Sequence, residues 1–324
     1  MIEAEYNALV SAAAAWTTTA LGQFEVSGPD AAAFVNRVAT ADLSVLRPGE
    51  FVHSLLLRDD ATILARVTIH RLNEVVMLLV DGAARAAAWR HLVDHKRGTV
   101  RLRDISDDVA VIAVRGPRTI AQLTVRLAPI PARAGQIARA QLDGIDLFAA
   151  RTTSDGPDGL DLYCRGRDLP SLGDALARVG VPLVSDETWQ VTRLERGIAR
   201  LGHEIDPEDT PLEAALEHLV VENKGTRFPG EVAFAERKRT GALRRRVGFS
   251  VPGVSTPPVG AVVQLNGHPV DRVRSIGVSP RFGIIGQTAV PLGSDTPGTA
   301  LRITHNGRHW DAVVTAMPFN QVAT

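Results

Sequence analysis

Two stretches of the chain repeat one order of apolar and polar positions, which predicts an internal duplication. Residues 24–29 read as an apolar strand that ends in Gly-Pro, and a helix with apolar positions follows. Residues 111–117 repeat this strand and its Gly-Pro, again before a helix. Proline is favoured in the first turn of a helix, where its missing N–H has no partner. Each stretch continues with a strand pair and a second helix, which predicts two related α+β halves packed face to face.

The segments between these repeats predict a hairpin and two further helices. Residues 51–57 and 65–72 read as strands, with Asp59 and Asp60 in the hairpin between them. Residues 190–198 predict a helix, and residues 213–221 predict a second, amphipathic one.

The pattern changes near residues 236–246, where apolar positions become rare. Beyond it, short apolar runs alternate with turns, and Asn-Gly occurs at 266–267 and again at 306–307. Asn-Gly between apolar runs is the strongest short hairpin signal. We therefore expect a small all-β barrel at 243–324. It should follow an α+β region at 1–235, whose halves span about 1–110 and 111–235.

Composition restricts the setting and the partners. The 324 residues carry a formal net charge of zero, so no global field favours nucleic acid or an anionic membrane. The single Cys164 excludes an internal disulfide and fits a reducing, cytoplasmic setting. The chain shows no signal-peptide pattern and no apolar run of the length a membrane span needs. His305 and His309 flank an Asn-Gly turn and read as a solvated hairpin, so we expect no metal site.

Two charged segments need interpretation. Basic residues at 237–239 and 244–246 read as a solvated linker; the alternative is contact with a polyanionic tail or an acidic partner. Glu195 lies in Arg-Leu-Glu-Arg-Gly at 193–197, before Gly-His-Glu-Ile-Asp at 202–206. From the residues alone, Glu195 reads as the structural partner of an arginine. In an interior cavity, it would instead bind a ligand that presents a pair of N–H donors.

A colinear set of motifs extends over nearly the whole chain. The set begins with Phe-Val-Asn-Arg-Val-Ala-Thr-Ala-Asp at 34–42 and Arg-Pro-Gly at 47–49. It continues with the segments at 193–197 and 202–206, Thr-Pro-Leu-Glu-Ala at 210–214 and Lys-Gly at 224–225. Ser-Ile-Gly-Val-Ser-Pro at 275–280 and Met-Pro-Phe at 317–319 complete it. In order and spacing, this set resembles the glycine-cleavage T-protein (aminomethyltransferase) family. The resemblance implies an aminomethyltransferase-like folate-binding core of two α+β halves with a terminal β-barrel.

The resemblance also implies tetrahydrofolate as cofactor. It makes Glu195 the anchor of the pterin ring, since a carboxylate can accept the paired N–H groups of that ring. Further folate contacts are implied at Arg66, Phe228 and Glu231.

Departures from the family pattern argue against glycine cleavage itself. The family's Asp-Asp pair is Ala65-Arg66 here, its folate-contacting Tyr is His53, and its Asn is Asp81. A family Arg is replaced by Glu231. We therefore expect a tetrahydrofolate-dependent methyl or methylene transferase or demethylase acting on a small-molecule methyl donor. In it, His53 would transfer protons and Asp81 would orient it.

Two alternatives stay open. The first is an accessory folate-binding protein of the YgfZ type, which supports iron–sulfur proteins; Thr226 stands where that group carries a cysteine. The second is an interaction scaffold that has lost its ligand, with a protein partner.

Overall fold

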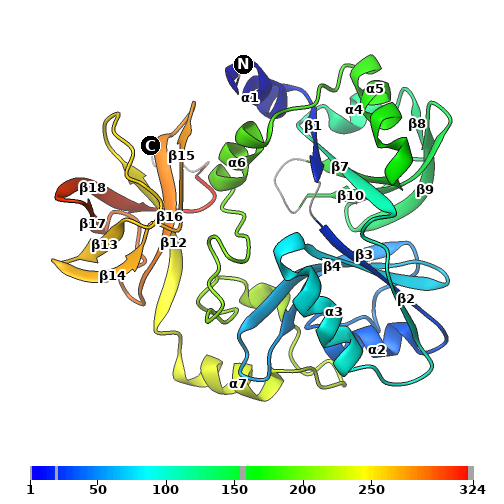
Figure 1. The fold of residues 1–324 in the computed structure, drawn as a ribbon, viewed down its shortest axis with the longest axis horizontal. Coiled ribbons are helices and arrows are strands. Elements are labelled where there is room, and N and C mark those ends of the chain that lie inside the picture. Colours follow the sequence, from blue (N-terminus) through cyan, green and yellow to red (C-terminus); the bar gives the residue numbers. More distant parts are fainter. Residues whose placement is uncertain (1, 19–20, 154–157, 320–324) are drawn as a thin grey trace. The chain divides into compact units, whose positions relative to one another are not determined.

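The computed structural model describes residues 2–18, 21–153 and 158–319, and they fall into two compact units (Figure 1). The first unit comprises Met1–Arg58, Leu64–Thr188 and Leu219–Pro229. The second comprises Asp59–Ile63, Trp189–His218 and Gly230–Thr324. The chain therefore enters the second unit well before the barrel boundary that we expect at 243. Within the described residues, no helix is both long and apolar enough to cross a membrane.

The first unit contains the duplication that the sequence predicts, on one 11-stranded sheet. The first repeat consists of β1 Ala14–Thr18, β2 Leu21–Ser27, α2 Ala31–Val38, β3 Glu50–Leu57, β4 Ile63–Arg71, β5 Val75–Asp81 and α3 Arg85–Asp94. The second consists of β6 Arg101–Asp104, β7 Val109–Arg115, α4 Thr119–Leu123, β9 Gln136–Leu142, β10 Ile145–Thr152, β11 Gly159–Arg165 and α5 Leu169–Arg178. Helix α1 Ile2–Ser11 precedes them, and the short strand β8 Leu127–Ala128 pairs with β9.

The strand order shows that the repeats exchange their first strands. The sheet runs β1-β7-β11-β10-β9-β3-β4-β5-β2-β6. Strand β1 thus pairs with β7 of the second repeat, whereas β6 pairs with β2 of the first. Strands β3 and β9 join the two series where Glu50 pairs with Gln136.

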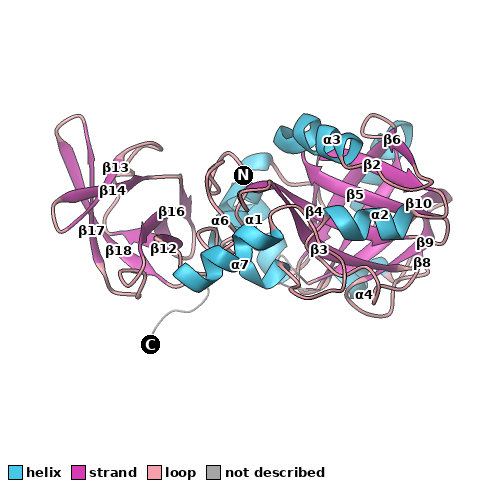
Figure 2. Cartoon of the chain, turned by 90° about the horizontal axis from the view of Figure 1, so that it is seen from below, coloured by secondary structure: helices cyan, strands magenta, loops and turns pink. Residues whose placement is uncertain are grey.

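Both faces of each repeat are covered. Helices α2 and α3 pack against β2 and β5 (Figure 2). Helix α5 packs against β11, with Leu172, Ala175 and Leu176 in the core of the second repeat. On the other face, side chains from both repeats meet in one apolar cluster that includes Phe51 and Tyr163. The repeats therefore lie face to face, as the sequence predicts.

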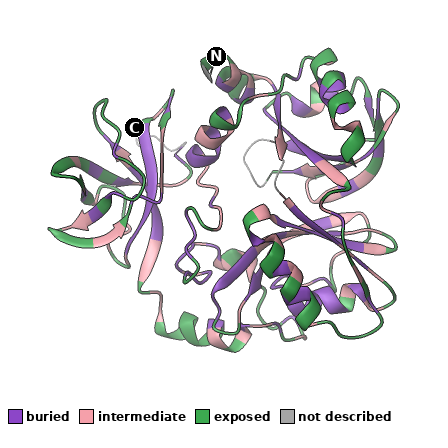
Figure 3. Cartoon of the chain, viewed as in Figure 1, coloured by how far each residue is buried: buried purple, intermediate pink, exposed green. Residues whose placement is uncertain are grey.

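The second unit is built on a seven-stranded antiparallel sheet in the order β14-β13-β17-β18-β12-β16-β15. Its strands are β12 Arg244–Val251, β13 Val262–Leu265, β14 His268–Arg272, β15 Ser275–Ser279, β16 Gly283–Pro291, β17 Ala300–His305 and β18 Arg308–Thr315. Both Asn-Gly pairs form the expected hairpins, with Asn266 and Asn306 at positive φ. Strands β12 and β16 are buried along most of their length (Figure 3). This region confirms the C-terminal β-rich part of the predicted fold.

Two helices accompany this sheet in the second unit, and one predicted helix is absent. Helix α6 Asp186–Glu195 corresponds to the helix expected at 190–198, and α7 is Glu231–Thr240. The expected helix at 213–221 is wrong, since only the 3-10 turn η3 Glu217–Leu219 forms there. Ala215 has a φ of 56°, and the Glu213 side chain accepts the N–H of Thr210. The apolar spacing therefore belongs to a folded loop.

The basic run at 244–246 is not a solvated linker. It starts β12, and each arginine has a partner within the second unit. Arg244 pairs with Asp209 at 2.7 Å, and Arg245 with Glu217 at 2.8 Å. Arg246 is buried and donates to two main-chain oxygens. These charges fix the loop that precedes the sheet.

Candidate functional site

Polar side chains gather on the face of the first repeat that meets the second repeat. His53 on β3 lies beside Thr68 on β4, with 3.1 Å between Nδ1 and the hydroxyl oxygen. The ring of Phe51 meets that of His53 edge-on at 5.7 Å. Because side chains alternate along a strand, Arg66 points to the same face as Thr68. The hydrogen bond to Thr68 orients the His53 imidazole, the group that we expect to transfer protons.

Arg66 and Asp81 occupy neighbouring positions on this face. Strands β4 and β5 pair antiparallel through Val67 and Val80, and Arg66 and Asp81 are the next residues along the two strands. Both side chains are half-buried. Ala65 on the opposite face is fully buried, so a carboxylate there would have no water around it. Three of the expected site residues thus share one face.

A second histidine lies deeper on this face, and the sequence alone does not single it out. His70 is 1% exposed, and its Nε2 lies 3.3 Å from the hydroxyl of Tyr163 on β11. Burial lowers the pKa of His70 to about 3, and the charge of His53 acts in the same direction. His70 is therefore neutral at physiological pH and joins the two repeats as a hydrogen-bonding group.

This pKa predicts how acid weakens the first unit. An unfolded histidine has a pKa of about 6.5, so below that pH protons bind the unfolded chain in preference to the folded one. The stability that neutral His70 contributes is fully present above about pH 6.5 and is lost as the pH falls toward 3, at up to about 1.4 kcal/mol per pH unit. In thermal melts between pH 7 and 4.5, the melting temperature of His70→Phe should fall less steeply with decreasing pH than that of the wild type. The exposed His305→Phe serves as control, and a His70→Phe slope equal to the wild-type slope would contradict the assignment.

In the second unit, Glu195 is the last residue of α6 and is 8% exposed. Its Oε1 accepts a hydrogen bond of 2.5 Å from the hydroxyl of Ser279, at the end of β15. That hydroxyl in turn accepts the N–H groups of Arg281 and Phe282. The main-chain oxygen of Glu195 accepts the N–H of Phe319 at 2.7 Å. Hydrogen bonds thus hold both the carboxylate and the main chain of Glu195.

The other carboxylates near Glu195 in the sequence have structural partners. Arg193 reaches Glu204 at 2.7 Å, and both side chains are buried. Arg274, with a fully buried side chain, contacts Asp206 at 3.0 Å and Asp209 at 2.6 Å. The arginine two residues before Glu195 is thus paired with Glu204. The acidic residues at 204, 206 and 209 thus connect this segment to arginines of α6 and of the turn before β15.

Phe228 and Glu231 each have a structural role: Phe228 packs against Lys224, and Glu231 starts α7. Phe228 is 5% exposed, and the Lys224 ammonium lies 5.0 Å from the centre of its ring. Lys224 donates to three main-chain oxygens at the C-terminal end of α2, where a cation is favoured by the helix dipole. Glu231 begins α7, where a carboxylate is favoured for the same reason. Their folate contacts stay predictions.

Thr68, His70, Tyr163 and Ser279 are polar residues that the sequence reasoning did not select. A period of two along β4 places Arg66, Thr68 and His70 on one side of that strand, and this signal was available in the sequence. The pairing of His70 with Tyr163 joins residues 93 positions apart and has no local signal.

Comparison with known proteins agrees with this architecture, a duplicated α+β core followed by a β-rich region. The model of the GCVT N-terminal domain matches residues 1–224. A probable aminomethyltransferase of Natronomonas pharaonis is 31% identical, over 98% of this chain and 90% of the relative. The aminomethyltransferase of Bacillus subtilis is 29% identical with the same coverage. The crystal structure of the glycine cleavage system aminomethyltransferase T from Bartonella henselae aligns with a TM-score of 0.88 and 26% identity, over 98% of this chain and 89% of that one.

These findings first define the class, a protein with the fold of the aminomethyltransferases. The chain belongs to the GCVT family, whose model covers more than half of its residues. The resemblance described from the motifs is therefore confirmed.

Proposed function

We propose that this chain is a tetrahydrofolate-dependent one-carbon transferase that takes a methyl or methylene group from a small methylated substrate. The observation that carries the proposal is Glu195, a carboxylate that is 8% exposed and rigidly held, in a chain similar to aminomethyltransferases over 98% of its length. Tetrahydrofolate would supply the nitrogen that accepts the one-carbon unit.

The chemistry of Glu195 fits a pterin ring. A carboxylate offers about four acceptor directions, which is more than the Ser279 hydroxyl uses. A ring that presents two parallel N–H donors matches such a group in geometry and charge. Because the residue is buried, hydrogen bonds to it are strengthened by the low local dielectric.

Proton transfer on the substrate side is assigned to His53, with Thr68 as the residue that orients its ring. An imidazole exchanges protons near neutral pH, which suits general acid–base chemistry. Asp81 on the same face would orient the His53 imidazole together with Thr68, and Arg66 would contact the folate. The substrate would differ from that of glycine cleavage, because Ala65 and Arg66 supply no carboxylate there.

The test of the function is methyl transfer to tetrahydrofolate from a panel of methylated amines, ethers and thioethers. Formation of a methylated or methylenated folate with at least one donor supports the proposal. Folate binding without transfer to any donor would favour the accessory, YgfZ-type role. Cys164 does not support the cysteine-centred form of that role, since burial raises the pKa of its thiol to about 11.

His53→Asn should lower kcat by about 100-fold, since a positioned general acid or base contributes rate enhancement of roughly that size. The substitution keeps a hydrogen-bonding group near Thr68 but removes the titratable nitrogen. Tetrahydrofolate binding, followed by fluorescence, should change little. The matched control is His268→Asn, at an exposed position in β14. Unchanged kcat in His53→Asn would refute the assignment.

Two further parts of the proposal concern setting and partners. We propose a cytoplasmic location, because a single cysteine forms no internal disulfide and fits a reducing compartment. We also propose a protein partner, because the Bartonella henselae relative is named as part of a glycine cleavage system.

A further inference from the structure

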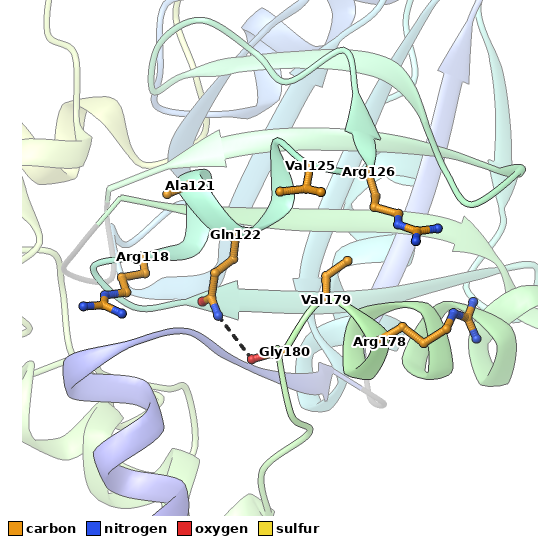
Figure 4. A pocket seen from close by; sticks show the side chains of 8 residues that line it. All are labelled: Arg118, Ala121, Gln122, Val125, Arg126, Arg178, Val179 and Gly180. Atoms are coloured by element: carbon orange, nitrogen blue, oxygen red, sulfur yellow. Dashed lines mark hydrogen bonds between the residues drawn. The ribbon is translucent and has the colours of Figure 1, made fainter.

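An open pocket of about 720 Å³ lies on the first unit, between α4 and the C-terminal end of α5. Three arginines line it, Arg118, Arg126 and Arg178, and none of the described lining residues is acidic. Figure 4 shows Arg118 at one end of the pocket, and Arg126 and Arg178 at the opposite end. The pocket therefore presents positive charge at both ends.

Among the described residues, one carboxylate is paired with these arginines. Arg126 and Arg178 share Asp143, at 3.2 and 3.1 Å, and each arginine side chain is 56% exposed. Arg118 is exposed, and no ion pair of its side chain is found within the part of the chain that the structure describes. With three cations and one anion, the site keeps a net positive charge of about two, which attracts anionic groups.

The middle of the pocket is apolar. Val125 is 77% exposed, and Val179 lies opposite it in Figure 4. Beside them, the Gln122 amide donates to the main-chain oxygen of Gly180 at 3.3 Å. An apolar side chain of a ligand would be favoured here, because it would remove the exposed surface of Val125 from water.

We propose that this pocket binds an extended acidic segment of a partner protein. One acidic side chain would pair with Arg118 and another with Arg126 and Arg178, since the guanidinium fork matches a carboxylate. An apolar side chain between them would cover Val125. A simple dicarboxylate would satisfy the charges but would leave Val125 exposed.

The test uses the full chain and a fluorescein-labelled peptide Glu-Asp-Leu-Asp-Glu, followed by fluorescence anisotropy at about 0.05 M salt, where charge pairs are weakly screened. The acidic peptide should bind at least about tenfold more tightly than Gln-Asn-Leu-Asn-Gln. Arg118→Glu should weaken binding by at least about tenfold, because one end of the pocket reverses its charge.

Arg167→Glu is the matched control, since Arg167 is exposed on the same unit and lies outside the pocket. It should bind the peptide as the wild type does, and circular dichroism should show that both variants are folded. Equal affinity for the acidic and neutral peptides, or no effect of Arg118→Glu, would overturn the proposal. So would suberate displacing the peptide at an equal concentration, because the pocket would then recognise a small dianion. None of these outcomes depends on whether the chain transfers one-carbon units.

Discussion

Replacing Glu195 by glutamine should weaken tetrahydrofolate binding by about 100-fold. A hydrogen bond to a charged group contributes about 1.5–3 kcal/mol, and about 1.4 kcal/mol changes an affinity tenfold. Glutamine keeps the size of the side chain but turns an NH2 group toward the donors of the pterin ring. The loss would be measured by fluorescence titration, and also as a smaller rise in melting temperature with added folate.

Two variants separate this effect from damage to α6. Glu187→Gln makes the same chemical change at an exposed position of that helix and should bind folate normally. Ser279→Ala removes the hydroxyl that orients the carboxylate and should lose affinity by less than Glu195→Gln does. Full affinity in Glu195→Gln would mean that the carboxylate has the structural role that the residues alone suggest.

The second large effect is expected for Arg274→Met, which should destabilise the second unit by about 3–5 kcal/mol. The Arg274 side chain is fully buried and contacts Asp206, Asp209 and Asp271. Without it, three buried carboxylates would each lose one counter-charge, although Asp206 would still pair with Arg272 and Asp209 with Arg244. Removing one partner from a buried ion pair is strongly destabilising. Because the chain has two compact units, a single two-state free energy does not describe its unfolding. The melting temperatures of Arg274→Met and the wild type are therefore compared, and the variant should melt about 10 °C lower.

The pKa of Asp206 gives this prediction a dependence on pH. Burial raises the pKa of Asp206, but the hydrogen bond from Arg272 and the charge of Arg274 outweigh it, and the pKa is lowered overall. The contribution of this group is present above the ordinary pKa of an aspartate and is lost as the pH falls through the lowered value. The defect of Arg274→Met should therefore shrink in acid.

Arg302→Met is the control for Arg274→Met. Arg302 lies in the same sheet, and its pair with Asp311 is exposed at 3.7 Å. Such a pair contributes about 0–1 kcal/mol, so the midpoint should hardly move. Similar losses in the two variants would show that the buried position of Arg274 gives it no special role.

Local patterns in the sequence predicted those parts of the fold that depend on neighbouring residues. The repeated strand, Gly-Pro and helix revealed the duplication, and Asn-Gly pairs located hairpins of the second unit. The predicted helix at 213–221 failed because helical spacing of apolar residues does not exclude a loop. There, the positive φ of Ala215 ends any helix.

Contacts between residues far apart in the sequence could not be predicted from such local patterns. Arg244 and Arg245 looked solvated because their partners, Asp209 and Glu217, are 35 and 28 residues away. For the candidate site, His53, Arg66 and Asp81 could be chosen from a family pattern. Their sharing of one face with Thr68 and His70 depends on the register of β3, β4 and β5, which the sequence did not specify.

Because the two repeats exchange β1 and β6, the first unit resembles a strand-swapped dimer whose two subunits are joined in one polypeptide. Each repeat completes its sheet with a strand that belongs, by chain order, to the other repeat. A chain ending after α3 would leave β1 without β7 and would expose the edge of β2. The two repeats are therefore one cooperative folding unit, and an N-terminal fragment released during synthesis would be prone to pair with a second copy of itself.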